Sequence, residues 1–271
     1  MLKINDALFG NETFKNNEVI YKEVPLEDDI NTITMVFENN KDIADLMFAA
    51  AYIRSEKPAA KLELNMPYLP YSRMDRKINE QVFSLKLFAE MLNAMHFSIV
   101  RVIDPHSEVS GCINNLYVVP IEHIVATVAA EVKADVILFP DAGSRRKYTQ
   151  VYRNICEKYP VIYAEKVRDL KDRGRILSSK IVDENGLDLN DKTVLIVDDI
   201  CVGGRTFQLA SEALKEKGVK DVYLWVAHCE NAVFDSPLLP ENHIKHIYTT
   251  DSIIRKKEDT RITAIHVVCD A

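Results

Sequence analysis

Short runs of apolar, often β-branched residues alternate along the chain with longer stretches whose apolar residues recur at helical spacing. A short, mostly apolar run is typical of a strand in a parallel sheet covered by helices. Such runs predict strands at residues 61–66, 98–103, 135–139, 161–164, 194–198 and 222–226. The alternation therefore predicts an α/β fold whose sheets are mostly parallel.

Three of the intervening stretches have the period of an amphipathic helix. Apolar residues recur with this period over residues 43–53 and 82–95. A third helix is expected over residues 206–217, because Gly218 follows it and a left-handed C-terminal cap costs least for glycine. Residues 167–179 carry many charges and little apolar periodicity, so we expect a mobile surface loop there.

The chain divides into two α/β parts of comparable size. Its 271 residues suffice for two ordinary domains, and 47% hydrophobic with 28% charged residues is the composition of a packed globule. We place the boundary near residues 120–126, which gives domains of residues 1–124 and 125–271. Each is expected to be a mostly parallel sheet flanked by helices.

Charge and cysteine content exclude several classes of protein. The formal net charge of −7 and the pI near 5.6 argue against a surface built to bind nucleic acid. No apolar run approaches the roughly 20 residues that span a bilayer, and the first residues lack the pattern of a signal peptide. The five cysteines form no CxxC pair and no zinc-ligand spacing. We therefore expect a cytoplasmic protein with reduced cysteines that binds neither nucleic acid nor membrane.

The most specific motif is VLIVDDICVGGRT, residues 194–206, in which an apolar strand ends in two carboxylates and a glycine-containing turn begins a helix. Amides at such a turn hold phosphate, and the carboxylates can accept hydrogen bonds from ribose hydroxyls; the alternative is that they only cap the helix. The segment resembles the phosphoribosyl-diphosphate loop shared by type I phosphoribosyltransferases and ribose-phosphate diphosphokinases. This resemblance implies ribose-phosphate binding by Asp198, Asp199, Gly203, Gly204, Arg205 and Thr206.

A second motif separates these two families. NMPYLPYSRMDRK, residues 65–77, resembles a segment that the diphosphokinases carry and ordinary phosphoribosyltransferases lack. The resemblance implies that Arg73 binds ATP, although Met74 stands where the family usually has glutamine. A basic, aromatic surface loop is the alternative interpretation. Rigid aromatic walls and an ion pair are expected beside the arginine, at Tyr68, Tyr71, Asp75 and Arg76.

Two further strand ends offer metal ligands. His106 in residues 103–108 and Asp141 in residues 139–143 stand where the resembling diphosphokinases bind Mg²⁺ and the ATP phosphates. Magnesium takes hard oxygen ligands and keeps several waters, so one carboxylate, one imidazole and ATP oxygens make a suitable set. A lone histidine after a strand is usually an ordinary loop residue, and only the order of the motifs favours the metal site.

The segment AEKVRD, residues 164–169, lies where the family has a strand leading into a flexible loop. In the resembling enzymes a lysine and a nearby arginine of this loop close over the transferred diphosphate. The resemblance makes Lys166 and Arg168 the catalytic candidates, because cations there would stabilise charge that develops on the β-phosphorus. A solvated run of charges is the alternative.

The segment FKNNE, residues 14–18, is the weakest match. It stands where the family receives adenine and its ribose from a neighbouring subunit. The resemblance implies ATP binding by Phe14, Asn16 and Glu18, although Asn16 replaces the usual aspartate. The resembling enzymes are dimers arranged into hexamers, so a homo-oligomer is expected.

Taken together, the motifs imply two Rossmann-like halves of phosphoribosyltransferase type. The implied reaction is Mg²⁺-dependent transfer of diphosphate from ATP to the anomeric hydroxyl of a 5-phosphorylated ribose, with release of AMP. No Walker phosphate loop is present. Two alternatives remain open: a type I phosphoribosyltransferase, which shares the loop of residues 198–206 but does not need the Arg73 segment, and a non-catalytic regulatory homologue.

The acceptor also stays open. The family's loop closes around one 5-phosphate with a further aspartate, hydroxyl residues and a glycine, whereas residues 202–205 here read VGGR. Arg205 adds bulk and charge, and the basic residues 145–147 add more where the family has a single arginine. An arginine fork suits a diphosphate, so ribose 5-phosphate and the larger ADP-ribose are both candidate acceptors.

Overall fold

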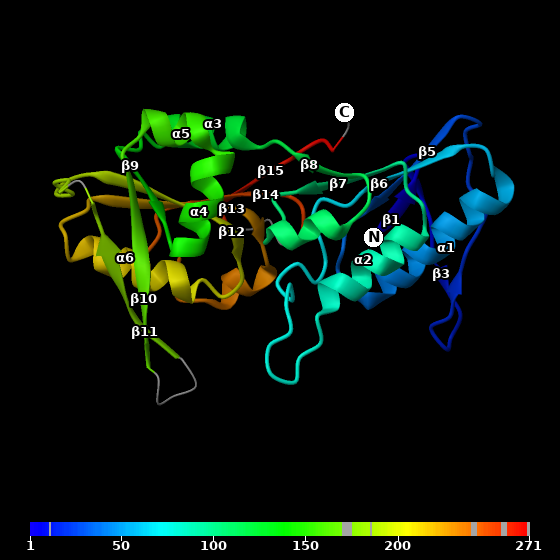
Figure 1. Ribbon diagram of the computed structural model, residues 1–271, viewed down its shortest axis with the longest axis horizontal. Coiled ribbons are helices and arrows are strands. Elements are labelled where there is room, and N and C mark those ends of the chain that lie inside the picture. Colours follow the sequence, from blue (N-terminus) through cyan, green and yellow to red (C-terminus); the bar gives the residue numbers. More distant parts are fainter. Residues whose placement is uncertain (11, 170–174, 185, 240–242, 256–258, 270–271) are drawn as a thin grey trace. The chain divides into compact units, whose positions relative to one another are not determined.

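The computed structural model describes residues 1–10, 12–169, 175–184, 186–239, 243–255 and 259–269 (Figure 1). Its contacts divide the chain into two compact units, Met1–Pro120 with Val268–Ala271, and Ile121–Val267. Each unit is described by itself. The division into domains of residues 1–124 and 125–271 stays a prediction.

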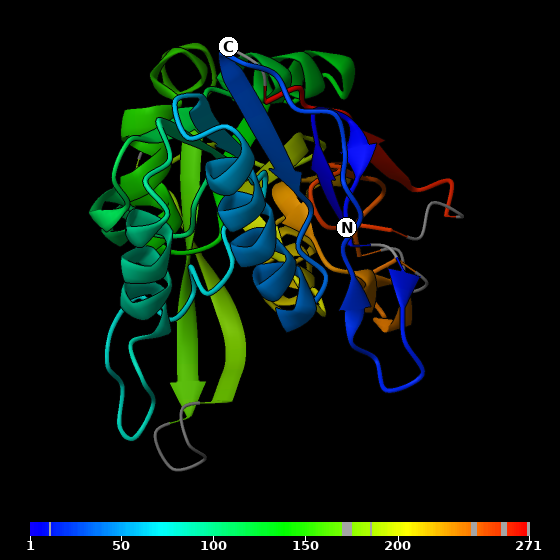
Figure 2. The same ribbon diagram turned by 90° about the vertical axis from the view of Figure 1, so that its right-hand side faces the viewer.

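The first unit is built on a six-stranded sheet in the order β2-β1-β5-β6-β7-β8. Its strands are β1 (Leu2–Ile4), β2 (Ala7–Leu8), β5 (Ile30–Met35), β6 (Lys61–Asn65), β7 (Ile99–Ile103) and β8 (Leu116–Val119). The strands from β5 to β8 are parallel, and β1 and β2 add an antiparallel edge. A separate hairpin consists of β3 (Glu12–Thr13) and β4 (Val19–Ile20) (Figure 2).

Two helices, α1 (Asn40–Glu56) and α2 (Ser84–Ala94), bury the apolar residues of this sheet, and a 3-10 helix, η1 (Glu108–Cys112), follows β7. Helix α1 begins with a capping box between Asn39 and Asp42, which satisfies two of its otherwise unpaired amides. Removing large side chains from water stabilises the unit by about 25 cal/mol for each Å² of apolar surface. The core unites Leu46, Ile53, Leu64, Phe88 and Val102.

The second unit has a seven-stranded sheet in the order β11-β10-β9-β12-β13-β14-β15. Its strands are β9 (Val136–Phe139), β10 (Val161–Asp169), β11 (Arg175–Val182), β12 (Thr193–Cys201), β13 (Asp221–Cys229), β14 (Ile247–Thr250) and β15 (Ile262–Ile265). All neighbours are parallel except β10 and β11, which form an antiparallel hairpin. Its helices are α3 (Glu122–Glu131), α4 (Ala142–Val151), α5 (Arg153–Lys158), α6 (Arg205–Lys215) and the 3-10 helix η2 (Asn231–Asp235).

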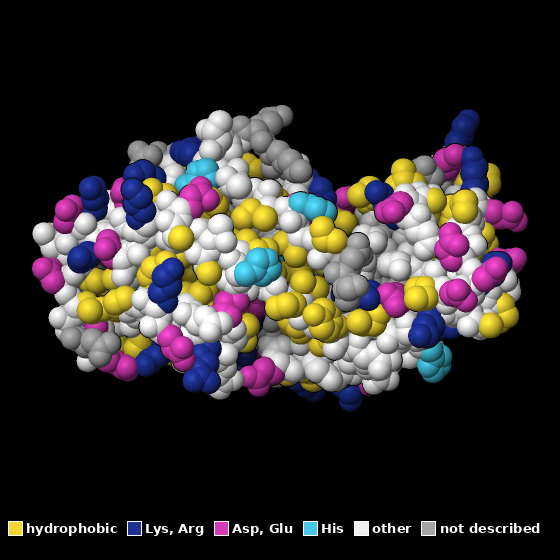
Figure 3. Space-filling view, turned by 90° about the horizontal axis from the view of Figure 1, so that it is seen from above, with side chains coloured by type: hydrophobic (Ala, Val, Ile, Leu, Met, Phe, Trp, Pro, Cys, Tyr) yellow, Lys and Arg dark blue, Asp and Glu magenta, His cyan; other side chains and the backbone are white. Residues whose placement is uncertain are grey.

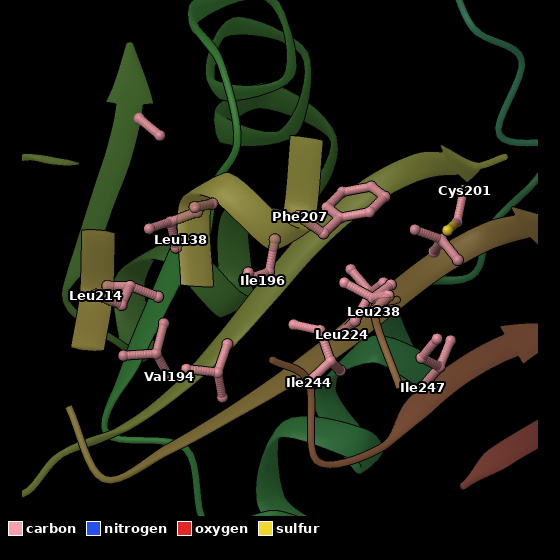
Figure 4. Packing of buried hydrophobic residues seen from close by; sticks show 14 of the residues in the cluster. Leu138, Val194, Ile196, Cys201, Phe207, Leu214, Leu224, Leu238, Ile244 and Ile247 are labelled. Atoms are coloured by element: carbon pink, nitrogen blue, oxygen red, sulfur yellow. The ribbon is translucent and has the colours of Figure 1, made fainter. Parts of the chain in front are cut away.

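Helix α6 packs on the strands at the centre of this sheet. Phe207 and Leu214 from the helix meet Val194 and Ile196 from β12 and Leu224 from β13 (Figure 4). All five side chains are almost completely buried. The helix is closed after its last turn by Val219, whose N–H donates to the carbonyl of Leu214 at 3.2 Å, and by Gly218, whose φ is 78°.

The predicted α/β fold with mostly parallel sheets is confirmed, and so are the six predicted strands and three predicted helices. The expected loop over residues 167–179 is wrong, because β10 continues to Asp169 and β11 begins at Arg175. Residues 170–174 lie outside the described part of the chain. Strand pairing uses backbone hydrogen bonds that charged side chains do not prevent, so weak apolar periodicity was a poor guide here.

Charged side chains of both signs are interspersed on the face drawn in Figure 3. Lys and Arg side chains alternate there with Asp and Glu side chains, in line with the formal net charge of −7. Within the described residues, none of the helices has both the length and the apolar character needed to cross a membrane.

The conformation of the turn between β12 and α6 predicts that two neighbouring glycines differ in how well they tolerate replacement by alanine. Gly204 has a φ of 71°, and a Cβ added there would lie 2.7 Å from Leu238 Cδ2, whereas one added at Gly203 would meet no atom within 4 Å. We expect Gly204→Ala to lower the free energy of unfolding by about 2 kcal/mol or more, and Gly203→Ala to change it by less than about 0.5 kcal/mol. Urea denaturation of both variants tests this. Equal destabilisation would contradict the described turn.

Candidate active site

The paired carboxylates lie on β12, near its carboxyl end at Cys201. The strand is buried from Val194 to Val197, and it then turns polar at Asp198, which is half-buried, and Asp199, which is 6% exposed. Open α/β sheets bind their ligands at this edge, where parallel strands end and the chain turns into loops. The predicted ribose-phosphate residues therefore begin where a ligand of this fold is expected.

The turn after β12 delivers the amino end of α6 to the same place. Gly204 is the N-cap residue in a left-handed conformation, and as a glycine it has no side chain with which to cap the helix. The first-turn amides, which have no partner within the helix, are thus oriented as they are in phosphate sites. Gly203 and Arg205 are exposed and Thr206 is half-buried. The structure brings all six predicted ribose-phosphate residues into one strand end and turn.

Asp141 caps the helix that follows β9. Its Oδ1 accepts a hydrogen bond from the Ser144 N–H at 2.9 Å, and the Ser144 hydroxyl lies 3.2 Å from the Asp141 N–H in return. Because β9 is the parallel neighbour of β12, Asp141 and Asp198 stand at the ends of adjacent strands. The structure therefore groups a third carboxylate with the two of β12.

Lys166 and Arg168 lie on β10, the other parallel neighbour of β9. Their backbone pairs with β11, with Lys166 opposite Ser179 and Arg168 opposite Ile176. Their side chains lie outside the described part of the structure, so their catalytic roles stay predictions. The topology nevertheless places predicted site residues on three neighbouring strands: Lys166 and Arg168 on β10, Asp141 just beyond β9, and Asp198 and Asp199 on β12.

The basic residues after Asp141 do not all add positive charge to this edge, contrary to expectation. Arg145 forms a two-pronged ion pair with Glu184, with N–O distances of 3.0 and 2.7 Å, so its charge is compensated. Lys147 lies 4.9 Å from the ring centre of Tyr148. Arg146 is exposed. Of these three residues, Arg146 alone keeps the exposed position that an anionic ligand needs.

A buried polar cluster at the same sheet edge was missed by sequence reasoning. His228 ends the apolar run of β13, and its Nδ1 lies 2.7 Å from Ser252 Oγ. Ser252 in turn lies 2.9 Å from the hydroxyl of Thr250, which donates to the carbonyl of Ala227. All three side chains are at most 3% exposed. The available signal was that polar residues follow the apolar runs of β13 and β14, as they do in β12.

Two cysteines close the interior beneath the carboxylates. Cys201 and Cys229 are register neighbours on β12 and β13, and both are fully buried. A hydrogen bond with Cys229 and burial raise the pKa of the Cys201 thiol well above its usual range. These cysteines are therefore packing residues rather than nucleophiles.

In the first unit, the aromatic residues of the Arg73 segment are part of the core. Tyr68 is only 8% exposed, so it is no open wall of a ligand site. Tyr71 is half-buried, its hydroxyl lies 2.8 Å from Asn40 Oδ1, and its ring meets Phe88 edge-on at 5.5 Å. These contacts hold the turn that bears Arg73, which is exposed.

The other end of that segment lies against the loop that bears His106. Asp75 pairs with Arg76 at 3.0 Å, as predicted. Burial by itself raises the pKa of Asp75. Hydrogen bonds from Arg76 and Ser107 and the nearby charges of Arg76 and His106 lower this pKa by more, so the net shift is downward. Arg73 and His106 thus belong to two segments that Asp75 joins, and both side chains are exposed.

Phe14, Asn16 and Glu18 lie together on the β3–β4 hairpin (Figure 2). The turn is closed by the Phe14 N–H, which donates to the Glu18 carbonyl at 2.8 Å, and by Asn16 Oδ1, which accepts from the Glu18 N–H at 3.2 Å. Phe14 is 57% exposed. Their contact with a nucleotide stays a prediction.

A complete metal site is not preformed in the described residues, since no group of three or more His, Cys, Asp or Glu side chains there could hold an ion. His106 belongs to the first unit and Asp141 to the second. Their joint role at one ion stays a prediction. A carboxylate and an imidazole suit a magnesium ion whose remaining ligands are phosphate oxygens and water.

Comparison with known proteins identifies the family. Residues 120–267, more than half of the chain, match the family described as Phosphoribosyl transferase domain. The chain belongs to this family. A solved structure, the phosphoribosylpyrophosphate synthetase from Mycobacterium smegmatis, has the same fold, with a TM-score of 0.72 and 20% identity over 94% of this chain and 84% of that one.

Curated relatives carry the name ribose-phosphate pyrophosphokinase, a synonym of diphosphokinase. The relative from Campylobacter jejuni is 26% identical over 84% of this chain and 72% of its own length. The relative from Sulfolobus acidocaldarius is 28% identical over 84% of this chain and 77% of its own length. The resemblance predicted from the motifs is therefore confirmed.

Proposed function

We propose that this phosphoribosyl transferase domain protein transfers diphosphate from ATP to the anomeric hydroxyl of a 5-phosphorylated ribose and releases AMP. The observation that carries the proposal is that predicted site residues lie on β10, just beyond β9 and on β12, which are neighbouring strands of one sheet. The names of the curated relatives support the same reaction.

The sugar phosphate is proposed to bind at the end of β12. The first-turn amides of α6 and the hydroxyl of Thr206 would hold the 5-phosphate, and Asp198 and Asp199 would accept hydrogen bonds from the ribose hydroxyls. These contacts would fix the anomeric hydroxyl relative to the adjacent strand ends. Positioning of this kind supplies much of the rate in phosphoryl-type transfer, because little covalent chemistry is left to the protein.

ATP is proposed to bind through two exposed side chains of the first unit. Arg73 and His106 project from two segments that Asp75 joins, so they can act on one triphosphate. Phe14, Asn16 and Glu18 would receive the adenosine of a neighbouring subunit's ATP, which requires a homo-oligomer. A phenylalanine that is 57% exposed on a hairpin supports a stacking role of that kind.

Magnesium would be held by Asp141 and His106 together with ATP oxygens and water. The fit rests on the Asp141 carboxylate, a hard oxygen donor at the end of β9. When bound, the ion would offset the negative charge of the triphosphate. Substrate binding, orientation and stabilisation of the transferring group are assigned to the chain's own residues.

In the proposed reaction the anomeric oxygen forms a bond to the β-phosphorus, and the bond between that phosphorus and the oxygen shared with the α-phosphate breaks. AMP leaves, and the proton of the hydroxyl is released to solvent. Lys166 and Arg168 would stabilise the charge on the transferring group, the role that their positions on β10 and the family resemblance support.

Product analysis tests this function against its alternatives. Purified protein is incubated with Mg²⁺, ATP and a ribosyl 5-phosphate, and the products are identified by mass. The proposal predicts AMP and a sugar 1-diphosphate in equal amounts. Consumption of phosphoribosyl diphosphate with a free base, but no AMP from ATP, would instead support a type I phosphoribosyltransferase, and no turnover of either kind would support a non-catalytic homologue.

Lys166→Ala is expected to lower kcat by about a hundredfold or more, because the variant loses a charge that stabilises the transition state, while KM for ATP stays nearly unchanged. Lys180→Ala is the matched control, since Lys180 is an exposed lysine on the partner strand of the same hairpin. Steady-state rates of AMP release decide the outcome. Near-normal turnover in Lys166→Ala removes this residue from the mechanism.

The larger acceptor is proposed because of the turn before α6. Arg205 is exposed at the first helical position, and the space beside Gly203 is open to at least 4 Å. A guanidinium there can pair with the second phosphate of ADP-ribose, which ribose 5-phosphate lacks. The alternative is that Arg205 points into solvent and that the acceptor is ribose 5-phosphate.

Comparison of kcat/KM for the two acceptors, in wild type and in Arg205→Gly, tests the acceptor. If ADP-ribose is the substrate, Arg205→Gly should lower its kcat/KM by about tenfold or more through loss of a charge-assisted hydrogen bond, and should change that of ribose 5-phosphate little. A strong preference for ribose 5-phosphate that persists in Arg205→Gly would eliminate the larger acceptor.

A further inference from the structure

One arginine joins the first turns of α4 to the root of the β10–β11 hairpin. Arg145 Nη1 donates to Glu184 Oε1 at 3.0 Å, and Nη2 donates to Glu184 Oε2 at 2.7 Å. The guanidinium carbon of Arg145 also lies 4.2 Å from the ring centre of Tyr163. Tyr163 is on β10, and Glu184 closely follows β11, so the arginine contacts both arms of the hairpin. We call Arg145, Glu184 and Tyr163 the Arg145 latch.

The chemistry of the latch favours a fixed geometry over a loose surface ion pair. Arg145 Nη1 and Nη2 each donate to one carboxylate oxygen of Glu184. Such a bidentate pair fixes the orientation of the two planar groups as well as their distance. The hydrogen bonds with Arg145 lower the pKa of Glu184, so the carboxylate is charged at neutral pH. The side chains of Arg145 and Glu184 are 36% and 57% exposed, which means that the pair needs no large desolvation.

The latch lies at the point where the pairing of β10 with β9 ends. β10 pairs with β9 only from Val161 to Tyr163, opposite Ile137 to Phe139. Beyond Tyr163, the ladder partner of β10 is β11 alone, and the two strands extend past the other strands of the sheet (Figures 1 and 2). A two-stranded ribbon is marginally stable by itself and twists easily. Its direction is therefore set by the contacts at its root and by α6, which packs against β11.

The residues on either side of the latch are those assigned to the diphosphate. Asp141 is the N-cap of α4, so the helix that carries Arg145 also fixes Asp141. Lys166 and Arg168 follow Tyr163 on the same strand. A rigid link from α4 to Tyr163 and Glu184 thus sets where the backbone of Lys166 and Arg168 stands relative to Asp141.

We propose that the Arg145 latch is a positioning device for diphosphate transfer: it aims the β10–β11 hairpin so that Lys166 and Arg168 meet the group that Asp141 helps to hold. The proposal rests on the proposed function. Arg145, Glu184 and Tyr163 are positioning residues, and none of them needs to touch a substrate. The arginine at position 145 thereby serves the hairpin rather than the charge of the acceptor.

Paired kinetics and hydrogen exchange test the latch. Glu184→Gln and Arg145→Gln should each lower kcat by about five- to tenfold, with KM for ATP changed by less than about twofold, as expected for loss of a charge-assisted contact that acts on the transition state. Backbone amides of β10 and β11 should exchange faster, while those of β12 and α6 stay unchanged. The double variant should be no worse than either single one.

The matched control is Glu157→Gln, which breaks the ion pair of Arg153 and Glu157 on α5, with an N–O distance of 2.7 Å, in the same unit. It should change neither rate nor exchange. Because the same carboxylate-to-amide change is made at another exposed pair, a general charge effect would appear in both variants.

Each other outcome overturns a defined part of the account. Faster exchange with an unchanged kcat would make the latch purely structural. A lower kcat with unchanged exchange, or additive losses in the double variant, would mean that Arg145 acts on a substrate directly. Absence of diphosphate transfer in the wild-type protein would overturn the proposed function and the latch's role with it, whereas an active wild type with an unaffected Glu184→Gln overturns the latch alone.

Discussion

The parallel pairing of β9 with β10 and β12 is the constraint on which the candidate site depends. All four residues of β9 are buried, and β12 is buried over the stretch where it pairs with β9, so neither strand can carry polar chemistry along the stretch in which they pair with each other. Polar side chains must stand beyond the paired stretches instead. Because the three strands run in the same direction, the residues just past the stretches that pair with β9 lie toward the same edge of the sheet.

Helix α6 supplies the second element of that edge. Phe207 and Leu214 are buried against β12 and β13, and side chains of this size stabilise the packing by about 1.5 to 3 kcal/mol each. This packing fixes the helix axis, and the left-handed Gly204 turns the chain sharply enough to present the helix's first amides beside Asp198 and Asp199. The same apolar contacts that hold the fold thus direct the proposed phosphate site.

Much of this arrangement could be predicted from the sequence, because buried strands and strand-end motifs are local signals. The runs at β7, β9, β12 and β13 are mostly apolar, the run at β6 alternates polar with apolar residues, and the motifs after these runs pointed to the family that the comparisons then identified. The short strands β1 to β4 carry too few residues to show a period. The hairpin of β10 and β11 was mistaken for a loop, because its charged residues hide the backbone pairing.

Contacts between distant residues could not be predicted. Arg145 was expected to serve an anionic acceptor, but its partner Glu184 is 39 positions away and nothing local marks the pair. The hydrogen bond of Asp75 with Ser107 and the buried cluster of His228, Ser252 and Thr250 likewise join separate segments. Such contacts arise only from the tertiary fold, whereas the positions of the strand ends are set by sequence and topology.

The most direct test of the central claim is a crystal structure of the protein with Mg²⁺, a non-hydrolysable ATP analogue and ribose 5-phosphate. We predict that the 5-phosphate lies on the amides of residues 203–206, that Asp198 and Asp199 contact the ribose hydroxyls, and that the ion contacts Asp141 at about 2.1 Å or through one of its waters. A sugar phosphate bound away from this turn, with the ion remote from both Asp141 and His106, would contradict the account.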